Sequence, residues 1–148
     1  MEDLSRFHTL KGYELQNQVK ITPSMEDYLE MICRMSKEQT TVRINELAQH
    51  LNVKPSSASK MVQNLRESEL VDFQKYGYIS LTPKGRQLGD YMLYRHDVLL
   101  TFLRLLNGTQ NELEQVEKIE HFMDKRTVDN LHKLTVWLKD TPTWHPSK

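Results

Sequence analysis

Three side chains that can bind a divalent cation lie close together near position 120. Glu117, Glu120 and His121 have the spacing i, i+3 and i+4, so all three project from one side of a helix. Two carboxylates and an imidazole are ligands that Mn²⁺, Fe²⁺ and Zn²⁺ accept. The segment therefore predicts half of a divalent-metal site, which donors from elsewhere in the chain must complete.

Three further donors are candidates to complete this site. Asp27 and Glu30 are three residues apart in one predicted helix, and His96 lies in another. Each pattern alone is also typical of a solvated acidic face or a packed histidine, so a structural role stays open beside metal binding. Because Cys33 is the only cysteine, a multi-thiolate zinc site and an internal disulfide are excluded, and a core position is expected for it.

Apolar periodicity predicts the helices that carry these donors. A threonine followed by proline, the signature of an N-cap and first helical position, occurs at 22–23 and again at 82–83. The second pair starts a long helix. The apolar side chains at the end of this helix must pack against another surface, which a homodimer partner would provide. The expected helices of this kind span about 23–37, 83–106, 111–124 and 127–138.

A helix-turn-helix pattern lies between the first helix and the long one. Two short amphipathic helices are joined by a tight link at 52–55, with the small Ala48 where they approach and Val53 as an apolar plug. Two short strands follow within 70–81 and form a wing around a turn at 75–77. This arrangement predicts a mainly α protein with a small β wing that reads DNA.

The charge distribution supports a DNA-binding part and a separate metal-binding part, although the formal net charge is zero. Residues 41–95 hold eight basic and five acidic side chains, whereas 110–124 hold one basic and five acidic ones. The basic half can face phosphates and the acidic half can hold cations. The residues expected to contact DNA are Arg43, Pro55, Ser56, Ser57, Ser59, Lys60, Gln63, Lys75 and Tyr76.

Four regions follow from these patterns. They are an N-terminal arm (1–21), a winged helix-turn-helix domain (22–90), a helical metal-binding and dimerisation domain (91–140) and a tail (141–148). No apolar run approaches the ~20 residues of a membrane span. The polar and acidic start of the chain does not resemble a secretory signal. We therefore expect a cytoplasmic protein without a membrane partner.

Five segments, in order, resemble motifs of the diphtheria-toxin-repressor family of metal-dependent transcriptional repressors. They are TPSMEDYLE (22–30), PSSASKMVQ (55–63), LTPKG (81–85), YRH (94–96) and VEKIEH (116–121). The similarity extends from about residue 21 to 138. It implies an N-terminal winged helix-turn-helix plus a C-terminal helical dimerisation domain, and a homodimer that represses metal-uptake genes at a palindromic operator of double-stranded DNA.

The resemblance also implies a ligand set. The family ligands carry over to Asp27, Glu30, His96, Glu117, Glu120 and His121. Iron-sensing relatives have a methionine at the position of Asp27 and a cysteine at that of Glu117, so the carboxylates here resemble the manganese branch. This implies two Mn²⁺ ions bridged by Glu30, Glu117 and Glu120, with Fe²⁺, Zn²⁺ or another divalent ion as alternatives.

Other classes of function explain less of the sequence. A winged-helix regulator of a non-metal ligand accounts for the DNA-binding half but leaves the six matched donors unexplained. A purely structural helical dimer gives the basic helix and the wing no role. An enzyme is not expected, because paired Glu-x-x-His, H-E-x-x-H, G-x-S-x-G and phosphate-loop motifs are missing from the sequence.

Overall fold

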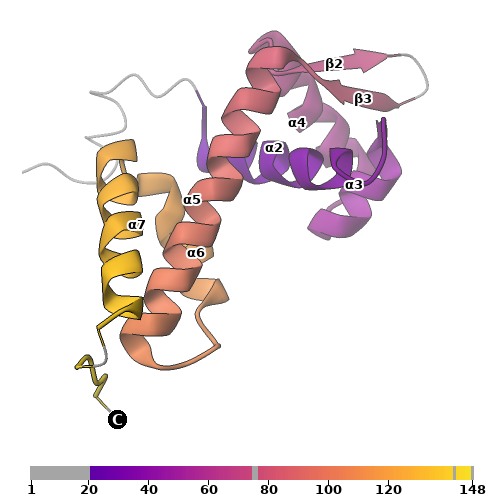
Figure 1. The fold of residues 1–148 in the computed structure, drawn as a ribbon. Coiled ribbons are helices and arrows are strands. Elements are labelled where there is room, and N and C mark those ends of the chain that lie inside the picture. Colours follow the sequence, from indigo (N-terminus) through magenta and orange to yellow (C-terminus); the bar gives the residue numbers. More distant parts are fainter. Residues whose placement is uncertain (1–20, 75–76, 142, 148) are drawn as a thin grey trace, which may run out of the picture.

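A computed structural model describes residues 21–74, 77–141 and 143–147. Figure 1 shows a winged helical domain connected by one long helix to a smaller group of helices. Nearly all of the predicted arm lies outside the described residues. In chain order the elements are α2 (Pro23–Ser36), β1 (Val42–Arg43), α3 (Ile44–Leu51), α4 (Pro55–Glu67), β2 (Val71–Gln74), β3 (Tyr78–Leu81), α5 (Pro83–Asn107), α6 (Leu113–Ile119), the 3₁₀ helix η2 (Glu120–Phe122) and α7 (Lys125–Lys139).

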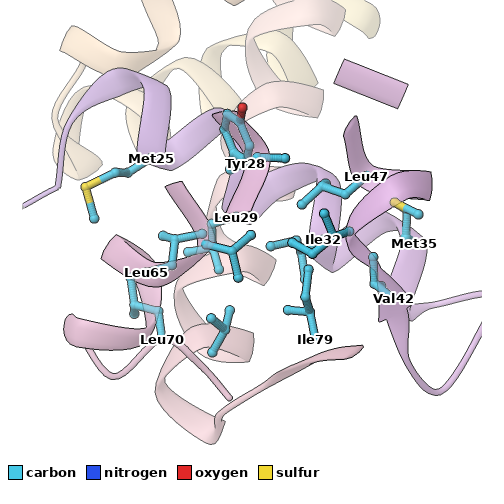
Figure 2. Close-up of a cluster of buried hydrophobic side chains, with 14 of the residues drawn as sticks. Met25, Tyr28, Leu29, Ile32, Met35, Val42, Leu47, Leu65, Leu70 and Ile79 are labelled. Atoms are coloured by element: carbon cyan, nitrogen blue, oxygen red, sulfur yellow. The ribbon is translucent and has the colours of Figure 1, made fainter. Parts of the chain in front are cut away.

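The predicted cap begins α2. The Thr22 hydroxyl accepts a hydrogen bond from the Met25 amide at 3.2 Å, and proline follows at the first helical position. The apolar face of α2 lies in a core built together with α3, α4 and the sheet (Figure 2). Leu29 and Ile32 are fully buried there. Because α2 packs on both helices of the helix-turn-helix, its position and theirs are coupled.

The helix-turn-helix and the wing form as predicted, with one addition. Asn52 takes the left-handed conformation (φ 54°) that ends α3, and the Val53 amide then donates to the Ala48 carbonyl at 2.9 Å. The only strands predicted from the sequence were the two within 70–81, and none was predicted before α3. Instead, β1 joins the wing in an antiparallel sheet of order β1-β3-β2, with Val42 opposite Ile79. The burial of Val42 explains why this short strand forms.

The long helix α5 connects the two halves of the molecule without interruption. Met92 belongs to the core of the winged domain, whereas Leu99 and Leu103 form a second core with Val116 of α6. The predicted division between residues 90 and 91 therefore falls inside one continuous helix. Within the part of the chain that the structure describes, no helix is long and apolar enough to cross a membrane.

The C-terminal half differs from the prediction at one position. A single helix was expected over 111–124, but α6 ends at Ile119 and the chain tightens into η2, as helix ends often do. Met123 is then extended and Asp124 caps α7 by accepting from the Thr127 amide at 2.7 Å. This turn lets α7 pack along α5. The tail is also anchored, since the Trp144 indole donates to the Leu106 carbonyl.

Candidate metal centre

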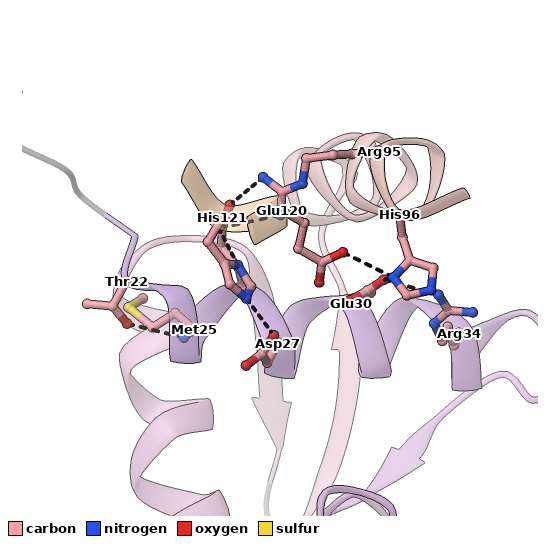
Figure 3. A network of polar contacts seen from close by, with 10 residues as sticks. Thr22, Met25, Asp27, Glu30, Arg34, Arg95, His96, Glu120 and His121 are labelled. Carbon is pink, nitrogen blue, oxygen red and sulfur yellow. Dashed lines mark hydrogen bonds and ion pairs between the residues drawn. The ribbon is translucent and has the colours of Figure 1, made fainter. Parts of the chain in front are cut away.

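A close crossing of α2 and α5 positions most of the predicted metal donors. The helices meet where Gly89 packs on Cys33, which is fully buried as expected. About two turns further along α5, His96 faces Glu30 of α2. The turn from α6 into η2 places Glu120 over this crossing. Donors far apart in the sequence therefore lie together (Figure 3).

One group of donors consists of Glu30, His96 and Glu120, with one ligand atom from each within 4.8 Å of the others. The Nδ1 atom of His96 lies 3.0 Å from Glu120 Oε2 and 3.6 Å from Glu30 Oε1. The hydrogen bond to Glu120 raises the pKa of His96, and the charge of Glu30 adds to it. Burial, followed by the charge of Glu120, raises the pKa of Glu30. The group thus concentrates negative charge in a partly desolvated space.

A second group consists of Asp27, Glu120 and His121, again within 4.8 Å. The Nε2 atom of His121 lies 3.0 Å from Asp27 Oδ1, and its Nδ1 atom lies 2.9 Å from Glu26 Oε1. The hydrogen bonds to Asp27 and then to Glu26 raise the pKa of His121 to about 9. These two carboxylates stabilise positive charge on the His121 ring, which explains the direction of the pKa shift.

Glu120 belongs to both groups and is the most buried of these donors. Its side chain is 1% exposed, and its Oε1 atom has no hydrogen-bond partner among the described residues. A buried carboxylate oxygen without a partner is costly, and such orphaned atoms often mark an ion site. Hard oxygen and imidazole donors around this atom fit a divalent cation.

Glu117 takes a different position from the other five predicted ligands. It lies on the exposed side of α6 and belongs to neither compact group. It does border the same cavity of about 440 Å³ as Asp27, Glu30, His96 and Glu120. The end of α6 at Ile119 explains the separation, because Glu120 and His121 no longer continue the helical stripe that begins at Glu117.

Sequence reasoning missed three charged side chains at this site. Glu26 contacts His121, Arg95 pairs with Glu26, and the Arg34 guanidinium lies 3.1 Å from Glu30. Glu26 and Arg95 directly neighbour predicted ligands in the sequence. Adjacent residues on a helix point in different directions, however, so only the positions of η2 and α5 reveal their contacts.

The predicted DNA-contacting residues lie on α4 and around the wing. Pro55, Ser56, Ser57 and Lys60 are exposed, whereas Ser59 and Gln63 are half-buried. Arg43 is exposed and lies over the Tyr78 ring at 4.9 Å, so the wing sheet holds its guanidinium. Lys75 and Tyr76 lie outside the described residues. The described members thus form a polar and basic surface on α4 with one cation beside it.

The fold and the site together define a class of protein. A winged helix-turn-helix shares its first helix, α2, with a carboxylate and histidine cluster completed by α5 and η2. Residues 20–79 match the family described as "Iron dependent repressor, N-terminal DNA binding domain". Residues 82–147 match "Iron dependent repressor, metal binding and dimerisation domain". The chain belongs to the iron-dependent repressor family, and it is a DNA-binding transcriptional regulator rather than an enzyme.

Named relatives agree with this assignment. The chain is 40% identical to the HTH-type transcriptional regulator MntR of Geobacillus kaustophilus (strain HTA426) over 120 residues, or 80% of this chain and 85% of that protein. The solved manganese regulator SloR has a TM-score of 0.66 at 28% identity and covers 79% of this chain. A manganese-dependent transcriptional repressor in complex with manganese has a TM-score of 0.64 at 29% identity and covers 76%. The chain spans only 55% and 53% of these two solved chains.

Proposed function

We propose that this protein is a homodimeric repressor of metal-uptake genes that binds its operator when Mn²⁺ is plentiful. The observation that carries the proposal is the buried Glu120 carboxylate, which faces donors from α2 on one side and α5 on the other. The site is thus built across the two halves of the molecule. A regulator that must couple ion binding to DNA binding needs such an arrangement.

The donor set supports manganese as the effector. Four carboxylates and two imidazoles are hard or borderline ligands, and the only cysteine is buried in the core against Gly89. One similar solved structure is described as a manganese regulator, and another as a manganese-dependent transcriptional repressor in complex with manganese. Zn²⁺ and Fe²⁺ are the alternative effectors, because the intrinsic affinity of such sites for zinc exceeds that for manganese.

The proposal includes two ions per subunit. Asp27, Glu120 and His121 would hold one, and Glu30, His96 and Glu120 would hold the other, with Glu120 shared. Glu117 would add a carboxylate from the rim of the cavity. The Glu120 carboxylate supports this assignment because one of its two oxygens has no hydrogen-bond partner among the described residues. The two oxygens of a carboxylate can bind two neighbouring cations.

The chain's own packing suggests how the site would control DNA binding. A bound cation would neutralise the crowded carboxylates and tie α2 to α5 and η2. Since α2 packs on α3 and α4, its orientation sets that of the proposed recognition helix, α4. In a dimer, this would fix the separation of two such helices for adjacent half-sites of a palindromic operator. The proposal includes a cytoplasmic location, where operator DNA is found.

A mobility-shift experiment with the full chain tests this function. Glu120→Gln keeps the size of the side chain but removes the shared charge, so we expect the Mn²⁺-dependent shift to be lost at concentrations that saturate the wild type. Glu114→Gln is the matched control, because it removes a carboxylate from α6 whose only ion-pair partner among the described residues is the exposed Lys118. Equal Mn²⁺ activation of both variants would refute the site. A wild-type protein that binds DNA equally with and without divalent ions would refute the function.

A further inference from the structure

Glu26 lies between the histidine of the proposed centre and a buried arginine. Its Oε1 atom is 2.9 Å from His121 Nδ1, while Arg95 Nη1 and Nη2 approach its Oε2 and Oε1 at 3.4 and 3.5 Å. Glu26 is on α2, His121 in η2 and Arg95 on α5. Three elements therefore meet at one carboxylate that belongs to neither donor group.

The contact between Glu26 and His121 Nδ1 distinguishes the two ring nitrogens of His121. A metal-ligating histidine commonly donates its second ring N–H to a carboxylate, which fixes the tautomer and the ring orientation. Here Nδ1 faces Glu26, and Nε2 faces Asp27, a member of the donor group. The ring is 7% exposed, so solvent offers little competition for either contact. Nε2 is therefore the nitrogen left for a cation.

Arg95 explains why Glu26 would orient the ligand rather than bind the ion. Its side chain is 5% exposed, and Glu26 is its only ion-pair partner within the described part of the chain. A buried guanidinium requires a counter-charge, so Arg95 holds the Glu26 carboxylate on its own side of His121. Both oxygens of Glu26 are engaged by Arg95 and His121, whereas Glu120 keeps an unpartnered oxygen.

We propose that Glu26 is a positioning residue that fixes His121 with Nδ1 protonated and Nε2 directed at the metal, and that Arg95 holds Glu26 in this role. The inference rests on the proposed function, because it requires that His121 be a ligand. It also predicts that changes at Glu26 and Arg95 act through one another rather than additively.

The test uses the full chain labelled with ¹⁵N-histidine and loaded with ¹¹³Cd²⁺ as a diamagnetic probe. We expect ¹¹³Cd coupling to Nε2 of His121 and a proton on its Nδ1. Mn²⁺ titrations then compare Glu26→Gln, Arg95→Lys and the double variant. Glu26→Gln should weaken affinity about 10- to 100-fold, the usual cost of losing an outer-shell partner, with the number of bound ions unchanged. In the Glu26→Gln background, Arg95→Lys should cause little further loss of Mn²⁺ affinity.

Controls separate this inference from the proposed function. Glu114→Gln should bind as the wild type, and circular dichroism without metal checks that each variant is folded. Cadmium coupling to Nδ1, a lost ion in Glu26→Gln, or wild-type affinity in that variant would each overturn the positioning role while leaving the metal centre in place. The ¹¹³Cd and proton measurement on wild-type His121 tests the positioning role even where a variant does not fold. If the wild-type protein binds neither Mn²⁺ nor Cd²⁺, that result would instead refute the proposed function.

Discussion

Gly89 of α5 faces Cys33 of α2 so closely that a Cβ atom on the glycine would lie 2.9 Å from both Cβ and Sγ of the cysteine. This approach sets the separation of the helices that carry Glu30 and His96. Cys33 has little freedom to move, since it is fully buried and its thiol donates to Asp90 at 3.5 Å. The glycine is therefore part of the architecture of the site.

Gly89→Ala should accordingly destabilise the protein and weaken Mn²⁺ binding. Helix propensity favours alanine by about 1 kcal/mol, but overpacking costs about 1–3 kcal/mol and forces the helices apart. We expect the overpacking to dominate, and urea unfolding with parallel Mn²⁺ titrations measures both effects. Gln87→Ala, at an exposed position of the same helix, is the control. Adding Cys33→Ala should recover part of the loss, and equal behaviour of the two alanine variants would contradict the prediction.

Local sequence patterns were sufficient to predict the elements that carry the site. Threonine–proline caps and apolar periodicity predicted α2 and α5, because both signals act within one helix. The break after Ile119 was not predictable in this way. It depends on Asp124 capping α7 and on α7 packing along α5, which are contacts with elements that follow in the chain. The strand β1 likewise exists only through its pairing with β3.

The site shows the same difference between what local spacing predicts and what depends on contacts between separate elements. Spacing suggested Asp27 with Glu30 and Glu120 with His121, and the structure brings these pairs into two groups that share Glu120, one of which includes His96. No spacing rule identifies Glu26 or Arg95, because their roles arise from the crossing angle of two helices and the position of a 3₁₀ turn. Glu117 shows the converse: its predicted helical spacing with Glu120 and His121 is interrupted where α6 ends at Ile119, and it belongs to neither compact group.

Mn²⁺ affinity should rise with pH because protons compete for His121. The contacts with Asp27 and Glu26 raise the pKa of His121 to about 9, so the ring is protonated at neutral pH without metal. Binding must then release that proton, and affinity should increase up to about tenfold per pH unit below pH 9 and level off above it. Calorimetry at pH 6.5–8.5 in buffers of different ionisation enthalpy measures the release. Binding without proton release at pH 7 would contradict this.

Removing a positive charge from the rim of the cavity should strengthen metal binding. Arg34 lines the cavity and pairs with Glu30 at 3.1 Å, so it competes with a cation for that carboxylate. Because exposed charge interactions are worth about 0.2–1 kcal/mol, Arg34→Gln should tighten Mn²⁺ binding by up to about fivefold. Lys37→Gln is the matched control, since Lys37 directly follows the last residue of α2 and pairs with Asp90 outside this cavity. Weaker binding by Arg34→Gln would show that Arg34 orients Glu30 instead.

Lys60 provides the test of the proposed DNA surface. It is exposed on α4 among small polar residues, a position from which an ammonium group can reach phosphate oxygens. Each phosphate contact contributes about 0.9 to the slope of log affinity against log salt, so Lys60→Ala should make that slope shallower by about one and weaken binding to all DNA sequences alike. Fluorescence anisotropy across a salt series with Mn²⁺ present measures the slope. Lys133→Ala, on α7, removes an equal charge away from α4 and should leave the slope unchanged. If both variants change the slope equally, only net charge matters, and Lys60 makes no specific phosphate contact.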